Sequence, residues 1–474
     1  MRSLTTSNAP PQIDGFIYSK VAELLFIGLL LVFIYPFFFV ISGVDPNIPI
    51  EAQSPTKIVY FLQVALPFSC LAIALMCRGS DLCLPGAIMI YPILCLASII
   101  WSVGPYDTFK YATLMLLYIL AIAAVCQLLD IGVFCNIIVK LFAFIILASV
   151  VMAIALPNYG IHQLDDGVAD VHDGEWRGVF GHKNQLGPAA SVVVFIFLFF
   201  PRLINASVGF RVMCIVAAVA CLIFAHSAGS WLSLGMLVGY YFLIRTVPVS
   251  RNFLALIVFG VSALAFTAFY FFGEDLVAIV GRDATFTGRT DIWRIVLDAV
   301  WQKPLFGFGY AAATDDFIRP LLIAQLGSAA VDAHNGYLDV MLGIGIAGLA
   351  VLVFLMLSVI IRGIGRVKMS AGREADCFML LLSFPILSLL ASFFEAEPIS
   401  GVQGVLGSLN YLSLTAVPLY LRLERGNYQS PTSAAHTRSV TRPSTNGWKV
   451  ERPRDTGEPA PSVWIPPPAD PDPP

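Results

Sequence analysis

Charged residues are scarce in this sequence. Asp, Glu, Lys and Arg together make up 12% of its 474 residues, whereas 58% are hydrophobic, and the net charge is −3. The mean hydropathy is +0.80. A chain of this length with so few polar side chains cannot cover a water-soluble globule, and it has no basic excess for binding nucleic acid. The composition therefore excludes the soluble classes and predicts an integral membrane protein whose solvent is a lipid bilayer.

Alternation of apolar and polar residues, the mark of membrane β-barrels, is also missing. The chain offers instead about twelve unbroken apolar runs near the ~20 residues that a helix needs to cross a membrane. The first run covers 22–41, and the others centre near residues 67, 93, 119, 144, 194, 216, 236, 261, 348, 383 and 411. The sequence thus predicts an all-α integral membrane protein with about twelve transmembrane helices.

Cysteine is absent from both long connections between these runs. All nine cysteines lie within or beside apolar runs, and no two of them are spaced as CxxC. This pattern excludes a disulfide framework and a cysteine metal site. It is typical of small residues that pack inside a membrane protein.

Positive charge is nearly missing from the short odd-numbered connections, beyond Lys57 and Lys110, and gathers in the even-numbered ones. Because cytoplasmic connections carry an excess of Lys and Arg, we predict that both termini are cytoplasmic and that two long loops, at about 157–184 and 273–333, face the periplasm. No small-residue cleavage site follows the first apolar run, so no cleavable signal peptide is predicted.

Three parts follow along the chain. They are a cytoplasmic N-terminus (1–21), a polytopic membrane domain (22–425) and a Pro-rich, disordered cytoplasmic tail (426–474). The tail lacks the apolar content to bury a core. It is either a recognition motif for a partner or a segment without function.

The first long loop ends in WRGVFGHKNQLG, which brings Arg177, Lys183 and Asn184 to the start of a membrane helix. Cationic groups at a helix N-terminus attract phosphate, although Arg177 and Lys183 could also be interfacial anchors. The residues before this motif are rich in Asp and His. They suit a divalent cation or a solvated acidic stretch, and because their spacing matches no defined metal loop we predict no metal site.

The second long loop contains GRTDIWRIVLDAVWQKPLFGFG. A predicted amphipathic helix that ends before Pro304 carries its apolar residues on one face: Trp293, Val296, Leu297, Val300 and Trp301. Such a helix is expected to lie on the outer leaflet rather than to cross it. Arg289, just before the helix, points a bidentate donor toward the membrane surface or pairs with a nearby Asp.

His334 stands at the start of the long apolar run near residue 348. A histidine at this depth is either a polar interfacial residue or a base that faces a lipid-borne substrate. A transporter places ionisable residues near the bilayer midplane, where Lys140 is the clearest charge in this chain. The polar residues cluster instead outside the apolar runs, which favours an enzyme that acts on a lipid-anchored substrate.

Three motifs resemble the O-antigen ligase and polysaccharide polymerase (Wzy-type) family of bacterial inner-membrane glycosyltransferases. They are WRGVFGHKNQLG, then TGRTDIW with PLFGFGY, then HNGYLDVMLGIG, all on the same predicted side. His334 and Gly345 reproduce the His-x10-Gly spacing of the ligases. The Arg-x3-Leu pattern of ligases is not reproduced, because no leucine follows Arg289 or Arg294 at that offset. This departure favours the exopolysaccharide polymerase branch.

The resemblance implies an enzyme that transfers a glycan from an undecaprenyl-diphosphate carrier to a sugar hydroxyl at the periplasmic face of the inner (cytoplasmic) membrane, without metal or other cofactor. The acceptor is another lipid-linked repeat in a polymerase and the lipid A core in a ligase; a non-catalytic polysaccharide or lipid transporter is the remaining alternative. Partners would be the lipid-linked oligosaccharide, a flippase and a chain-length regulator. The implied site residues are His334 as the catalytic residue, Arg177, Arg289 and Lys183 for the diphosphate, and Asn184, Asn335 and Gly345 in support.

The chemistry of these residues agrees with those roles. A sugar hydroxyl is a poor nucleophile, so a base helps, and the positive end of a helix dipole keeps the His334 imidazole neutral. Guanidinium groups stabilise the charge that develops on a diphosphate leaving group. Asn335 is expected to cap the helix. The turn that holds Glu395 and Glu397 is expected to be an ordinary solvated turn.

Overall fold

The computed structural model describes residues 12–37, 57–163, 172–246, 250, 260, 287–326 and 333–429. For residues 12–16, 80, 287–290, 315 and 425–429 only the backbone is described. Internal contacts divide the chain into two units, Met1–Arg425 and Gly426–Pro474. The apolar run near residue 261, the acidic centre of the first loop and nearly all of the Pro-rich tail lie outside the described residues.

Helices make up the described chain, apart from one isolated bridge between Ile161 and Trp176. The longer helices are α1 (Gln12–Ile34), α3 (Ile58–Arg78), α5 (Pro105–Leu128), α6 (Ile131–Ala155), α8 (Lys183–Phe199), α9 (Val208–Phe224), α10 (Ala228–Thr246), α12 (Thr287–Gln302), α14 (Gly336–Met369), α15 (Gly372–Ala391) and α17 (Val405–Gln429). The shorter ones are α4 (Ile90–Ala97), α7 (Pro157–Gly160), α13 (Arg319–Leu326) and α16 (Glu397–Ser400).

Seven helical stretches among the described residues are long and apolar enough to cross a membrane. Gly86–Ile100, Lys183–Phe199 and Val208–Phe224 are shorter apolar helices. The prediction of an all-α integral membrane protein is confirmed in class. The number of about twelve spans stays a prediction.

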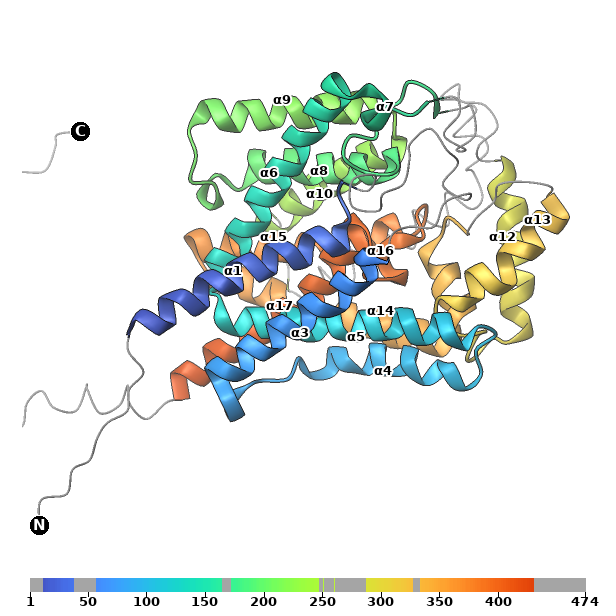
Figure 1. The fold of residues 1–474 in the computed structure, drawn as a ribbon, viewed down its shortest axis with the longest axis horizontal. Coiled ribbons are helices and arrows are strands. Elements are labelled where there is room, and N and C mark those ends of the chain that lie inside the picture. The colour runs from blue at the N-terminus through green and yellow to red at the C-terminus, as the bar shows by residue number, and fades with distance from the viewer. Residues whose placement is uncertain are drawn as a thin grey trace, which may run out of the picture. The chain divides into compact units, whose positions relative to one another are not determined.

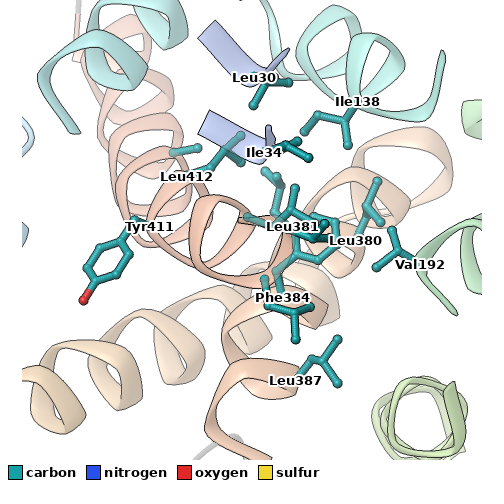
Figure 2. Close-up of a cluster of buried hydrophobic side chains, with 14 of the residues drawn as sticks. Leu30, Ile34, Ile138, Val192, Leu380, Leu381, Phe384, Leu387, Tyr411 and Leu412 are labelled. Atoms are coloured by element: carbon teal, nitrogen blue, oxygen red, sulfur yellow. The ribbon is translucent and has the colours of Figure 1, made fainter. Parts of the chain in front are cut away.

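Helix α15 lies at the centre of the bundle, and nearly all its side chains are buried. Figure 2 shows the cluster that surrounds it, with side chains from α1, α6, α8, α15 and α17: Leu30, Ile34, Ile138, Val192, Leu380, Leu381, Phe384, Leu387, Tyr411 and Leu412. Gly363 of α14 sits so close to Leu382 of α15 that a Cβ there would clash. Close packing of this kind associates helices in lipid, where the hydrophobic effect between them is weak.

Basic side chains gather at one end of the helices. Arg202, just after α8, and Arg245, at the end of α10, approach the buried carboxylate of Asp376 to 3.4 Å and 2.6 Å. The motif residues lie at the opposite ends, because α8 begins at Lys183 and α14 begins at Gly336. We call this the motif end. The predicted topology, with basic residues in the cytoplasm and motifs in the periplasm, requires this segregation.

Helix α12 is the amphipathic helix expected in the second loop. Its Trp293, Val296 and Val300 are buried and form one cluster with Leu322 of α13 and Leu338 of α14. Figure 1 shows α12 and α13 beside each other next to α14. Most of the apolar face that was expected to meet the outer leaflet is therefore covered by protein, whereas Trp301, which belongs to the same face, is 69% exposed. The depth of this helix relative to a membrane stays a prediction.

Candidate active site

Asn335 caps helix α14 and ties it to the turn after α15. The residue is fully buried, and its side-chain oxygen accepts hydrogen bonds from the N–H groups of Tyr337 (3.0 Å) and Leu338 (3.1 Å). Its Nδ2 donates to the carbonyl of Phe393 (3.3 Å). The capping role predicted for Asn335 is confirmed, and the second contact shows why an amide serves here better than a hydroxyl.

His334 is held between two anchored neighbours. It is half-buried and has a left-handed backbone, with φ of 43°. On one side the carbonyl of Ala333 accepts a 2.8 Å hydrogen bond from the indole of Trp293. On the other, the N–H of Gly336 donates to the carbonyls of Ser392 (2.8 Å) and Glu395 (3.0 Å). A conformation of this kind costs about 1–3 kcal/mol and persists only where its surroundings enforce it.

Helix α14 is broken at Gly345, whose φ of 72° and ψ of 179° are not helical. Residues 304–309, which we call the PLFGFG segment, lie across the break. The N–H groups of Phe308 and Gly309 donate to carbonyls before the break, both at 2.8 Å, and the N–H of Ile346 donates to the first carbonyl of the segment at 2.8 Å. The glycine of the His-x10-Gly spacing therefore opens the helix, and the second-loop motif replaces the lost backbone hydrogen bonds.

The other edge of the PLFGFG segment rests on the start of α5. The carbonyl of Phe308 accepts a hydrogen bond from the N–H of Val103 (2.8 Å). The N–H of Tyr310 donates to Ser98 Oγ (3.0 Å), and Thr108 Oγ1 donates to the carbonyl of Tyr310 (2.8 Å). Hydrogen bonds on both edges hold this loop backbone in place. The backbone in turn positions Tyr310 at the wall of a cavity.

A cavity of about 370 Å³ lies beside the broken helix. Sites for small molecules usually enclose ~300–1,000 Å³, so its size suits a small ligand. Asp339, one of the lining residues, lies in the first turn of α14, five positions after His334 in the sequence. The lining residues are Tyr111, Leu114, Tyr310, Ala311, Ala313, Thr314, Asp339, Val340, Gly343, Ala396, Glu397, Ser400, Gly401, Val402 and Gln403.

Glu395 and Glu397 belong to a turn that joins two motifs, which sequence reasoning missed. Glu397 lines both the large cavity and a small hollow beside Asn184, and Glu395 lines the hollow as well. The carbonyl of Glu395 accepts a hydrogen bond from the start of α14. One signal was available: these are the only charged residues between Asp376 and Arg422. The turn 395–398 is therefore the physical link between the first and third motifs.

Arg177 is fully buried in the first loop. Its Nε donates to the carbonyl of Tyr159 (3.0 Å), and its Nη2 donates to the carbonyl of Asn158 (2.9 Å). Its backbone N–H donates to the carbonyl of Gly160 (2.9 Å). The guanidinium thus holds the backbone of α7. Its role in binding a diphosphate stays a prediction.

Lys183 lies in a cluster of histidines around Glu175. Its Nζ is 2.5 Å from Glu175 Oε2, and His172 Nδ1 is 2.9 Å from the same oxygen. The rings of His162, His172 and His182 have centroids 5.1 to 5.9 Å apart. Lys183 is mostly buried, so its charge is matched by a carboxylate within the site rather than by solvent.

Asn184 and Arg289 are the remaining predicted site residues. Asn184 lies in the first turn of α8, where its N–H donates to His182 Nδ1 (3.1 Å), and it lines the small hollow with Glu395. Arg289 lies in the first turn of α12, and its side chain is outside the described residues. The structure thus brings together the segments of Lys183, Asn184 and His334.

In the part of the chain that the structure describes, no group of three or more His, Cys, Asp or Glu side chains is placed to hold a metal ion. The site therefore offers two kinds of group. Cations and imidazoles occupy the first loop, and acceptor oxygens with the phenols of Tyr111 and Tyr310 line the cavity. Such an arrangement can bind an anion at one place and hydroxyl groups at another.

Comparison with known proteins adds two findings. Residues 213–353 match the family model described as O-antigen ligase. The chain is 28% identical over 236 residues to the exopolysaccharide production protein ExoQ of Rhizobium meliloti (strain 1021). The aligned part covers 46% of this chain and 53% of that protein, so the chain spans about half the length of this relative. The family match contains Arg289, His334 and Gly345, and Arg177 and Lys183 precede it. Both findings confirm the resemblance that the three motifs indicate.

Proposed function

We propose that this chain, a membrane protein of the O-antigen ligase and polysaccharide polymerase type, transfers a glycan from an undecaprenyl-diphosphate carrier to a sugar hydroxyl of a lipid-linked acceptor. The reaction takes place at the periplasmic face of the inner membrane. The observation that carries the proposal is the convergence of the three motifs at the motif end, joined through the turn 395–398.

The proposed reaction needs a base for the acceptor, and His334 takes that role. As the hydroxyl oxygen bonds to the anomeric carbon of the donor sugar, its proton passes to the imidazole. The bond between that carbon and the diphosphate oxygen breaks, and the diphosphate leaves on its lipid. The anchored backbone on both sides of His334 supports this role, because a base must be positioned before it contributes its ~10²- to 10⁴-fold.

The leaving diphosphate needs cations. Lys183 begins helix α8, where the N-terminal N–H groups and the helix dipole add to its charge. Its partner here is Glu175, so a bound diphosphate shares or replaces that ion pair. Arg177 and Arg289 are proposed to complete the anion site, Arg289 from the first turn of α12.

The similarity to an exopolysaccharide production protein favours polymerisation, and the O-antigen ligase match keeps ligation to lipid A core as the second candidate. The glycan profile of a strain that lacks this gene separates them. Loss of polymer with single repeats retained indicates a polymerase, and polymer held on its lipid carrier indicates a ligase. An unchanged profile contradicts both.

A further inference from the structure

We propose that the cavity beside the α14 break is the subsite for the acceptor sugar rather than for the donor diphosphate. This inference rests on the proposed function and names the place of the acceptor within it. It is argued from the groups on the cavity wall: Tyr111, Tyr310, Thr314, Asp339, Glu397 and Gln403.

The hydroxyl of Tyr310 is available to form a hydrogen bond with a ligand in the cavity. The residue is only 6% exposed, and its hydroxyl lies on the cavity wall, 3.7 Å from where a Cβ on Gly401 would be. No residue in the described ranges forms a hydrogen bond with this hydroxyl. Buried tyrosine hydroxyls usually find a partner, because leaving a buried polar group unpaired is costly. A ligand hydroxyl in the cavity supplies one.

The same phenol is a permanent donor. Burial, followed by the nearby Cys95, Tyr411 and Asp339, holds the pKa of Tyr310 well above its ordinary value. Tyr310 lies outside the membrane-spanning stretches. It therefore stays protonated across the physiological pH range and donates to an acceptor oxygen, such as a sugar hydroxyl or ring oxygen.

The two carboxylates supply the complementary acceptors. Asp339 Oδ1 accepts a hydrogen bond from Thr314 Oγ1 (2.6 Å), and Glu397 Oε1 accepts one from the N–H of Leu406 (3.2 Å). These contacts orient both groups. Each carboxylate offers about four lone-pair sites, which suits the several O–H donors of a sugar. The ring of Tyr111 adds an aromatic surface for the apolar face of a pyranose.

The types of charged residue that line the cavity distinguish an acceptor sugar from a diphosphate. Asp339 and Glu397 are acidic, and no Lys or Arg is among the described residues that line the cavity. Lys110, on the neighbouring part of α5, instead packs over the rings of Tyr60 (4.0 Å) and Tyr111 (4.6 Å). A diphosphate would find no Lys or Arg side chain among the residues of this wall. The cavity therefore suits the acceptor ring, whereas the donor diphosphate belongs with the cations of the first loop.

The test measures binding apart from turnover. The probe is the repeat oligosaccharide released by mild acid from the cell's own lipid-linked pool, titrated by ligand-observed NMR against the full-length protein in nanodiscs. Tyr310→Phe removes only the unpaired hydroxyl, and Asp339→Asn removes charge while keeping shape. Their matched controls are Tyr106→Phe, at a residue that is 76% exposed, and Asp298→Asn, on the exposed face of α12.

The proposal expects saturable binding to the parent protein and to both controls, weakened roughly tenfold or more in each cavity variant. Equal binding in all five proteins, or no saturable binding to the parent, overturns it. Tyr310→Phe has no hydrogen bond to lose within the described chain, so its fold should survive, and its melting temperature checks this. If the repeat binds here but the protein elongates no glycan, the proposed function fails while this inference stands. If the protein elongates glycan but Asp339→Asn binds the repeat as tightly as the parent does, this inference fails while the proposed function stands.

Discussion

At the residue scale, Arg177 shows how one side chain can combine two roles. Lysine at this position keeps the charge but loses the two-pronged contact with the carbonyls of Asn158 and Tyr159. We expect Arg177→Lys to lower the melting temperature of the purified protein, because a hydrogen bond made by a charged group contributes about 1.5–3 kcal/mol. Arg294→Lys, at an exposed position on α12, is the control and should melt like the parent. A parental melting temperature for Arg177→Lys would contradict a stabilising role for the hydrogen bonds from Arg177 to α7.

Individual site residues were predictable where the chemistry is local. Asn335 stands at the head of an apolar run, so residue type and position sufficed to predict its cap, whereas the site roles of His334 and Lys183 stay predictions. Tyr310 and Glu397 could not be found in this way. They share a cavity wall only because the fold brings together residues nearly ninety positions apart, and nothing in the sequence near either residue indicates the other.

At the scale of elements, the break in α14 is the feature that most shapes the site. Gly345 has a positive φ, and a Cβ there would clash with the carbonyl of Leu305. We expect Gly345→Ala to reduce the amount of folded protein in the membrane, since the strained backbone alone costs about 1–3 kcal/mol. Immunoblots of membrane fractions and melting curves measure this effect.

Gly239→Ala is the matched control for this substitution. Gly239 lies in α10, and a Cβ there would meet no atom within 4 Å. Alanine is favoured over glycine in a helix by about 1 kcal/mol, so this variant should be as stable as the parent or more so. Equal abundance of the two variants would show that the break is not required.

The elements themselves were only partly predictable. The period of apolar residues around Trp293 indicated helix α12, and Pro304 indicated its end, because both are local signals. No local signal of this kind indicated the break at Gly345, because the apolar run continues through this residue. The cover over the apolar face of α12 also escaped prediction, because it comes from α13 and α14 through contacts that hydrophobic period alone does not specify.

At the scale of the whole molecule, the separation of basic end and motif end predicts a single orientation in the membrane. In a Cys77→Ser, Cys83→Ser background, which removes the exposed and half-buried native thiols, Gln325→Cys should react with a membrane-impermeant maleimide added outside the cell's inner membrane. Met369→Cys, exposed at the basic end, should react only after the membrane is opened. The reverse labelling would place the motifs in the cytoplasm and remove the periplasmic site from the account.

The measurement that tests the central claim most directly is glycan transfer by the purified protein in lipid vesicles, supplied with its lipid-diphosphate-linked repeat and no other enzyme. We expect longer glycan to form in step with release of the free lipid diphosphate. His334→Gln, present in equal amount and with a parental melting temperature, should lower the initial rate by about 10²- to 10⁴-fold, the usual contribution of a general base. A folded parent protein that releases no lipid diphosphate, or a His334→Gln variant that works at the parental rate, would contradict the account.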